Sequence, residues 1–247
     1  GRCRAGTPEQ MYDDLSWLGL EWEKPVRIQS EHRSDSSRVA RDLQRRKLLY
    51  PCFCSRNDIL REAERAGYAP HGSEGPVYPG TCRKLSDDER AARLATGENH
   101  SLRLDLSRAL EEVGTGLTWN DARHGIQPAR PDLLGDAILV RKDIGTSYHL
   151  SVVIDDALQG ITDIVRGVDL FDSTHLHRVL QALLDFPAPT YHHHPLLTDS
   201  GGNRLAKRDR AITLKCLRES GLSAANLRLE LGFPLDLEAL RTMTEIP

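Results

Sequence analysis

Three of the five cysteines lie in two short clusters whose spacing could hold a metal ion. Cys52 and Cys54 are separated by one residue, and Cys82 follows 28 positions after Cys54. Thiolates are favoured zinc ligands, and a structural zinc site needs four ligands. From the residues alone, His71 in the intervening chain is the obvious fourth ligand, which would complete a Cys3His site. The alternative is three buried free cysteines without a metal, because free cysteine is often part of a core.

A second candidate for chemistry is Arg166, which ends a β-rich run just before Gly167. A charge at the end of an apolar strand needs a partner, because burying it unpaired is costly. In α/β sheets, ligands bind at the carboxyl ends of strands. Arg166 is therefore a candidate receiver for a carboxylate or a phosphate. The alternative is a structural arginine paired with a nearby aspartate.

Two further clusters are less specific. Residues 201–208, GGNRLAKR, form a glycine turn followed by basic side chains. Such a loop could close on ATP and stabilise charge on a leaving pyrophosphate, although in isolation it is more often a solvated hairpin tip. His192–His194 suggest a metal, but neighbours on a strand point to opposite faces, so only the first and third share one. We do not expect a metal there.

The bulk composition narrows the class of protein. The chain has 247 residues, of which 39% are hydrophobic, with a mean hydropathy of −0.47 and a net charge of −3. No apolar run reaches the ~18 residues of a membrane span, and no secretory signal is evident. A protein that coats nucleic acid would be basic, so RNA binding would need local patches. The cysteine pattern predicts a reducing, cytoplasmic environment, and the lack of a long apolar run predicts no membrane association.

The predicted helices and strands that must position these residues alternate along the chain, which is typical of the α/β class. A helix begins at Thr7-Pro8 and ends at Gly19, and Ser86 begins another in a capping box. We expect Ser30 to cap a helix that runs to about Lys47. Residues 51–83 and 114–131 look irregular. The other predicted strands are 26–29, 101–105, 136–141, 161–165 and 191–197. The other predicted helices are 170–184, 211–219 and 224–231. We expect Cys216, on the second of these helices, to be buried in the protein core.

Three motifs in this order resemble the class I glutamyl-tRNA synthetases. YHLSVVIDDALQGITDIVRGVDL resembles the second half of their catalytic domain, and GNRLAKRD resembles their KMSKS-type loop. PCFC and YPGTC resemble the zinc-bearing insertion of the glutamyl-Q tRNA(Asp) synthetase branch. The resemblance covers about residues 1–220. It implies a helix over 148–156 and a Rossmann-like class I catalytic core (1–49 and 132–200), with a zinc-bearing insertion (50–131) and a loop followed by C-terminal helices (201–247).

The resemblance also implies roles for individual residues. Tyr148 and Arg166 match the tyrosine and arginine that hold the amino-acid substrate. Lys207 matches the functional second lysine of the loop and would be catalytic and bind ATP, and Arg204 replaces the first lysine as an ATP ligand. Ala206 stands where the family has serine, which removes a hydroxyl.

For the metal, the resemblance implies one structural zinc held by Cys52, Cys54 and Cys82, with Tyr78 in place of His71 as the fourth ligand. The choice between these two fourth ligands stays open at this point. A bound zinc can lower the pKa of a ligand and so make phenolate coordination possible.

The activity implied is ATP-dependent activation of L-glutamate, with Mg²⁺, followed by transfer of glutamate to queuosine in tRNA(Asp), by a monomer. The relatives carry an N-terminal strand and a HIGH-type motif that the sequence lacks, so we expect a fragment whose activity depends on them. Two alternatives remain: a truncated glutamyl-tRNA synthetase that charges tRNA(Glu), and an inactive, zinc-stabilised RNA-binding module.

Overall fold

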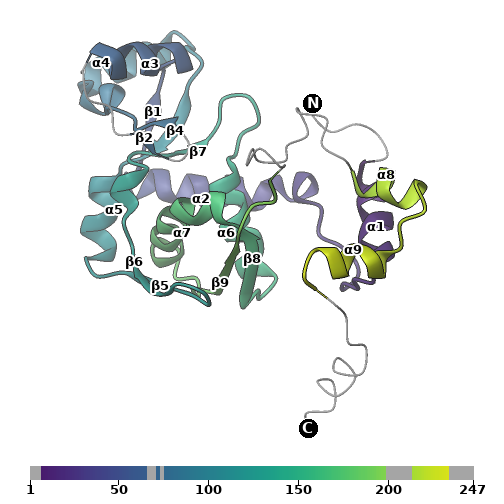
Figure 1. Cartoon of the computed structure of the whole chain (residues 1–247). Helices are drawn as coiled ribbons and strands as arrows, with labels where there is room; N and C mark the ends of the chain where they lie inside the picture. Colours follow the sequence, from purple (N-terminus) through teal and green to yellow (C-terminus); the bar gives the residue numbers. More distant parts are fainter. Residues whose placement is uncertain (1–6, 66–70, 73–74, 199–212, 234–247) are drawn as a thin grey trace. The chain divides into compact units, whose positions relative to one another are not determined.

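The computed structural model describes residues 7–65, 71–72, 75–198 and 213–233 (Figure 1). Its contacts divide the chain into two compact units, one of Gly1–Arg27 with Leu197–Pro247 and the other of Ile28–Leu196. The domain bounds expected from the sequence stay a prediction.

The first unit packs a helix from the early part of the chain against two helices from its late part. Within it, the Arg218 guanidinium lies 3.0 Å from the Asp14 carboxylate, and Arg228 donates to the carbonyl of Leu18. Gly19 ends the first helix with a φ of +80°, as predicted. Cys216 is exposed on its helix, so the expectation of a core cysteine was wrong. The helices of this unit are α1 (Thr7–Trp17), α8 (Leu214–Glu219) and α9 (Ala224–Glu230).

The second unit contains two larger sheets and a short hairpin. An antiparallel sheet has the order β1-β4-β7, and a four-stranded sheet has the order β6-β5-β9-β8. In the latter, β5, β9 and β8 run parallel and β6 is antiparallel at the edge. The strands are β1 (Leu49–Cys52), β2 (His71–Gly72), β3 (Gly75–Pro76), β4 (Ser101–Leu104), β5 (Thr118–Asp121), β6 (Gly125–Pro128), β7 (Ile138–Val140), β8 (Asp163–Gly167) and β9 (Thr190–His194).

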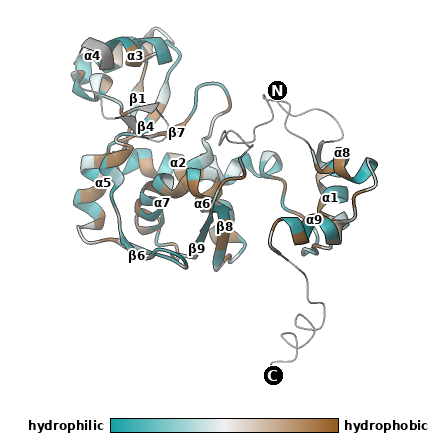
Figure 2. Cartoon of the chain, in the orientation of Figure 1, coloured by the Kyte–Doolittle hydropathy of each residue, from teal (hydrophilic) through white to brown (hydrophobic). Residues whose placement is uncertain are grey.

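Helices alternate with these strands, as the α/β prediction required. Several are amphipathic, and Figure 2 shows apolar and polar residues side by side on α5, α6 and α7. Ser147 and Ser86 cap α6 and α4 through their side chains, the latter in the predicted capping box. The helices are α2 (Arg33–Arg45), α3 (Arg56–Arg65), α4 (Asp87–Ala95), α5 (Leu106–Val113), α6 (Tyr148–Leu158) and α7 (Phe171–Leu183), with 3-10 turns at Gln29–Glu31, Thr81–Lys84, Pro131–Leu133 and Val168–Leu170.

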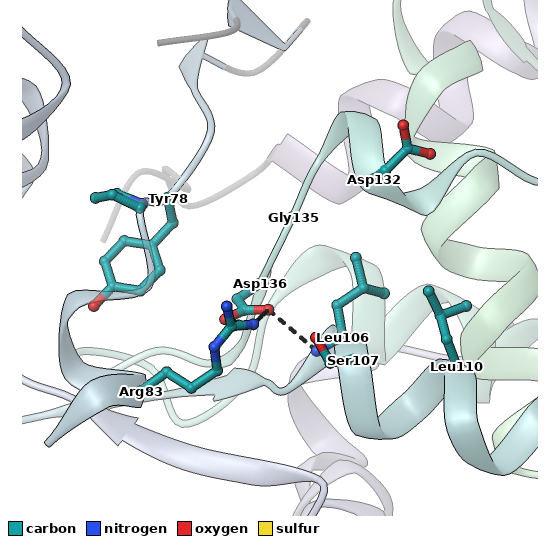
Figure 3. A pocket seen from close by; sticks show the side chains of 9 residues that line it. Tyr78, Arg83, Leu106, Ser107, Leu110, Asp132, Gly135 and Asp136 are labelled. Carbon is teal, nitrogen blue, oxygen red and sulfur yellow. Dashed lines mark hydrogen bonds and ion pairs between the residues drawn. The ribbon is translucent and has the colours of Figure 1, made fainter. Parts of the chain in front are cut away.

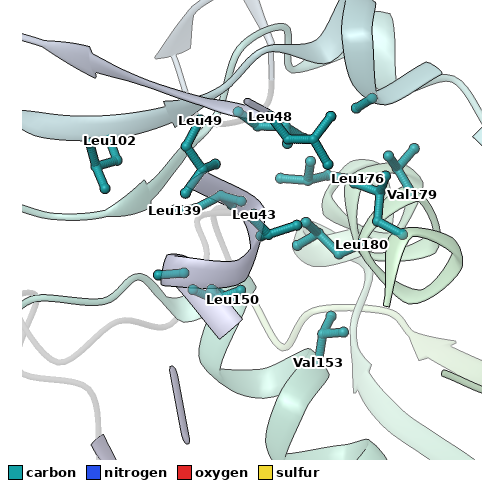
Figure 4. Packing of buried hydrophobic residues seen from close by; sticks show 14 of the residues in the cluster. Leu43, Leu48, Leu49, Leu102, Leu139, Leu150, Val153, Leu176, Val179 and Leu180 are labelled. Carbon is teal, nitrogen blue, oxygen red and sulfur yellow. The ribbon is translucent and has the colours of Figure 1, made fainter. Parts of the chain in front are cut away.

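The apolar core lies where α2, α6 and α7 meet the antiparallel sheet (Figure 4). Burying each large aliphatic side chain contributes about 1.5–3 kcal/mol relative to leaving it exposed. The predicted apolar face of the helix over 170–184 is confirmed, since its central leucines and valine are fully buried. Fully buried members of the core are Leu43, Leu104, Ala109, Leu139, Leu150, Leu176, Val179 and Leu180.

Four local predictions were wrong. The segment 51–83, expected to be irregular, contains the ten-residue helix α3. The segment 26–29 forms no strand, and Ser30 lies inside a 3-10 turn, so α2 begins at Arg33 after His32. The turn-rich segment 114–131 contains the hairpin of β5 and β6. A strand of this kind is stabilised by a partner far along the chain, here β9, so its own residues carry little signal. No helix among the described residues is long and apolar enough to cross a membrane.

Candidate functional site

The cysteine centre is assembled from the end of a strand and a tight turn. Cys52 ends β1, and Cys54 follows it. Gly80 has a φ of +80°, which turns the chain so that the backbone amide of Cys82 donates to the Tyr78 hydroxyl at 2.8 Å. A side chain at this glycine would be strained by that backbone conformation. The turn therefore brings the second cluster against the first.

Four potential ligand atoms converge at this centre. The three cysteine sulfurs lie within 4.8 Å of one another, and the Sγ atoms of Cys54 and Cys82 are 3.4 Å apart. The Tyr78 hydroxyl is 3.5 Å from Sγ of Cys52 and 3.6 Å from Sγ of Cys54. Tetrahedral zinc with bonds of about 2.3 Å sets neighbouring sulfurs about 3.8 Å apart, so the donor set fits a closed zinc site. The side chain of His71 lies outside the described residues.

The ionisable groups of this centre differ widely in pKa. A hydrogen bond from Cys52 lowers the pKa of Cys82 to about 6, although burial opposes the shift. The same hydrogen bond, together with burial, raises the pKa of Cys52 to about 12. Burial also raises the pKa of Tyr78 above its ordinary value. Of these three groups, therefore, Cys82 ionises at the lowest pH. The Arg103 guanidinium stacks 3.8 Å above the Tyr78 ring and adds a positive charge beside the centre.

Asp136 anchors the cysteine-bearing segment to the rest of the unit (Figure 3). The buried Asp136 carboxylate accepts from the Tyr50 hydroxyl at 2.6 Å and from the Arg83 guanidinium at 3.1 Å. The same carboxylate also accepts from the backbone amide of Leu106 at 3.1 Å, at the start of α5. A small cavity of about 200 Å³ opens beside these groups. Because Arg83 follows Cys82 directly, Asp136 fixes the turn that carries this ligand.

A larger cavity of about 760 Å³ extends from the cysteine centre to the start of α6. Cys54 and Tyr78 line one part, and Tyr148 and His149 line another. Its charged lining is mostly basic, so it favours an anionic occupant. The charged residues that line it are Arg56, Arg103, Arg141, Lys142 and Asp143.

Tyr148 occupies the first position of α6 and is 47% exposed. The Ser147 hydroxyl accepts from the amide of Leu150 at 3.3 Å, which fixes the helix start and hence the tyrosine beside the cavity. The Tyr148 ring centroid lies 5.9 Å from that of His177. Its phenol therefore reaches the cavity while its ring packs on a buried histidine.

Arg166, near the end of β8, is only 8% exposed and is held by neutral acceptors. Its Nε donates to Nε2 of His193 at 3.1 Å, and its Nη1 donates to Nδ1 of His177 at 3.2 Å. Its Nη2 donates to the Leu170 carbonyl at 3.3 Å and to the Thr174 hydroxyl. The Asp156 carboxyl lies close enough for the Arg166 charge to act on its pKa, so the choice between a substrate receiver and a structural arginine stays open.

The sequence did not predict the residues around this arginine. Asp121 is 1% exposed and accepts from Nδ1 of His193 at 2.7 Å and from Nδ1 of His124 at 2.8 Å. Burial opposes ionisation, but these hydrogen bonds lower the pKa of Asp121 below its ordinary range. The available signal was the alternation of His192–His194, since the middle ring is buried and the outer two are not.

The two residues expected to act on ATP, Arg204 and Lys207, lie outside the described residues, as does Ala206. Their roles stay predictions. The structure thus brings together Cys52, Cys54, Tyr78 and Cys82, and separately sets Tyr148 and Arg166 around His177.

Residues 2–230 match the catalytic domain of the class I tRNA synthetases (E and Q). The chain belongs to this family. It is 43% identical to the glutamyl-Q tRNA(Asp) synthetase of Rhodobacter capsulatus over 94% of this chain and 84% of that protein. It is 42% identical to the glutamyl-Q tRNA(Asp) synthetase of Symbiobacterium thermophilum over 90% of this chain and 69% of that protein. These likenesses confirm the expected family.

The solved structures agree on the fold. A glutamate tRNA ligase from Elizabethkingia meningosepticum, crystallised with its amino acid, aligns with a TM-score of 0.66 and 24% identity. The alignment covers 84% of this chain and 43% of that one. This chain therefore spans less than half of the ligase, and at this identity the likeness shows the fold alone. It confirms the expected fold of a class I synthetase catalytic domain.

Proposed function

We propose that this chain activates L-glutamate with ATP and transfers the glutamyl group to queuosine in tRNA(Asp). A glutamate carboxylate oxygen attacks the α-phosphorus of ATP, the bond to the bridging oxygen breaks, and pyrophosphate leaves. The glutamyl group then passes from the adenylate to the tRNA, and AMP is released. The reaction needs positioning and charge stabilisation and no protein nucleophile.

The observation that carries the proposal is the buried Arg166 guanidinium, whose described acceptors are all neutral. These hydrogen-bond partners do not neutralise the guanidinium, and a planar guanidinium suits a carboxylate. Tyr148, on the cavity wall, supplies a hydroxyl that can donate to the substrate. Glutamate carries two carboxylates, and these two residues are the candidates to bind them.

The phosphates of ATP, accompanied by Mg²⁺, are the anions that the basic cavity lining would favour. Arg204 and Lys207 lie on a loop outside the described residues, and they would place further positive charge next to the triphosphate. We expect Lys207 to act mainly on the adenylation step, when charge develops on pyrophosphate.

Zinc would be held by Cys52, Cys54, Cys82 and Tyr78, whose ligand atoms fit a closed tetrahedral site. Such a site is structural, because no position is left open for a substrate. When bound, the metal would stabilise a segment with a small apolar core around Tyr50 and Phe53.

The test is a glutamate-dependent exchange of pyrophosphate into ATP, followed by transfer of labelled glutamate to tRNA. The chain should be assayed in its complete reading frame. We expect exchange without tRNA, and transfer to tRNA(Asp) that carries queuosine. Transfer to tRNA(Glu) would instead identify a glutamyl-tRNA synthetase, and RNA binding without exchange would identify an inactive module. The relatives described above favour neither alternative.

A further inference from the structure

Arg166 lies at the centre of a buried row of polar side chains that runs from Asp121 to His149. His193 connects the arginine to Asp121, with contacts of 3.1 Å and 2.7 Å. On the other side, His177 connects it to Nδ1 of His149, with contacts of 3.2 Å and 3.1 Å. His177 and His193 are each only 1% exposed. Buried polar groups of this kind are costly unless every partner is in place, so the row constrains all its members.

The arginine fixes the tautomer of both histidines. A guanidinium can only donate hydrogen bonds, so Nε2 of His193 and Nδ1 of His177 must accept and carry no proton. The proton of His193 is then on Nδ1 and is donated to the Asp121 carboxylate. The proton of His177 is on Nε2 and is donated to His149. Burial lowers the pKa of both His177 and His193, which keeps these rings neutral.

This arrangement separates the guanidinium from the nearest carboxylate in the row. Asp121 orients His193 and does not touch Arg166. A direct ion pair would orient the arginine equally well, but would also cancel the charge that a substrate carboxylate needs. A neutral imidazole gives direction to the guanidinium and leaves its charge in place.

The row also reaches the proposed substrate site. His149 lines the large cavity beside Tyr148, and the Tyr148 ring centroid lies 5.9 Å from that of His177. The imidazole of His177 thus contacts both residues proposed to bind glutamate: it forms a hydrogen bond with Arg166, and its ring packs against that of Tyr148. Any displacement of His177 would move both.

We infer that His177 and His193 are positioning residues for substrate recognition, which hold the Arg166 guanidinium as neutral acceptors and keep its charge available to a carboxylate of L-glutamate. This inference rests on the proposed function. Recognition of the carboxylate would then depend on Arg166 and on the residues that orient it, including Asp121, which contacts Arg166 only through His193.

The experiment compares His177→Leu, which removes the acceptor, with His177→Asn, whose side-chain oxygen can take the place of Nδ1. In the pyrophosphate exchange assay of the full chain, we expect His177→Leu to raise the KM for glutamate about 10-fold or more, by analogy with loss of a partner that orients a ligand group. The KM for ATP should change less than about 2-fold. His177→Asn should restore the KM for glutamate to within about 3-fold of the unsubstituted chain.

A second pair guards against misfolding. His193→Gln keeps an acceptor near the position of Nε2, whereas His193→Leu does not, and His194→Leu is the matched control because His194 is exposed on the same strand. We expect only His193→Leu to raise the KM for glutamate. Equal changes in both KM values, or in the Leu and Gln variants alike, would reduce these histidines to structural residues. A complete absence of glutamate-dependent exchange in the unsubstituted chain would instead overturn the proposed function.

Discussion

The cysteine centre and the arginine row are both buried polar sites, yet only one is complete without a further group. Around Arg166, His177 and His193 each accept a hydrogen bond from the guanidinium through one ring nitrogen. Through the other ring nitrogen, His193 donates to Asp121 and His177 donates to His149. Around Cys82, three thiols and a phenol crowd together, and their hydrogen bonds lower the pKa of Cys82 while raising that of Cys52. The first site thus has its polar atoms paired within the protein, whereas the second gathers donor atoms that could hold a metal ion.

The largest effect should come from the cysteine centre. We expect Cys82→Ser to abolish zinc binding and to lower the free energy of unfolding by about 4 kcal/mol, since metal binding contributes folding free energy. For a chain of this size that corresponds to a fall in Tm of roughly 10 °C. Zinc content by elemental analysis and thermal unfolding would measure both.

Cys216→Ser is the matched control, because that thiol is exposed and distant in sequence. A purified chain without zinc, or equal thermal stability with and without a chelator, would contradict the proposal. If Tyr78→Phe keeps zinc and His71→Ala loses it, the fourth ligand is His71.

A smaller effect is expected at the arginine. Arg166→Ala should lower glutamate-dependent exchange about 100-fold, which equals about 2.7 kcal/mol, within the range for one charge-assisted contact. Zinc content should not change, because the hydrogen bonds described around the cysteines and those around Arg166 share no residue. Exchange near that of the unsubstituted chain would show that Arg166 is structural, and a simultaneous loss of zinc would show that the two sites are not independent.

The histidines of the row should also appear in the pH dependence of stability. Burial lowers the pKa of His177 well below its ordinary value of 6.5, so below that pH the unfolded chain binds a proton that the folded chain does not. Stability should therefore fall as the pH falls below 6.5. His177→Asn should reduce this slope by about one proton, or about 1.4 kcal/mol per pH unit. Urea unfolding at pH 7.5 and 5.5 would measure it, and an unchanged slope would indicate that His177 is protonated in the fold.

The smallest effect concerns Asp156 on α6. Burial raises its pKa to about 6 from 3.8, although the Arg166 charge opposes the shift. Here the folded chain binds more protons than the unfolded chain between these values, so this group makes stability fall as the pH rises through that window. The full pKa difference corresponds to about 3 kcal/mol, but this side chain is only partly buried and solvent screens its charge, so Asp156→Asn should stabilise the fold at pH 7 by about 1 kcal/mol and have little effect near pH 3.5. Destabilisation at pH 7 would mean that the carboxylate supports Arg166.

Local signals in the sequence were sufficient for several elements. The capping box at Ser86, the glycine after the first helix and the apolar face of α7 all appeared where their residues predicted them. The spacing of Cys52, Cys54 and Cys82 predicted a shared site, because chelation depends on residue types that are rare elsewhere. These features depend on residues close together in the chain or on distinctive chemistry.

Other features became visible only in the tertiary structure. The β5–β6 hairpin is completed by β9, and the row around Arg166 joins residues from β5, α6, α7, β8 and β9. Nothing near Asp121 in the sequence marks it as the partner of His193. The sequence by itself determined the family, several helix ends and the grouping of Cys52, Cys54 and Cys82. Only the tertiary structure decided which histidines face the arginine and which tautomers they adopt, because these depend on hydrogen bonds between strands and helices that are distant along the chain.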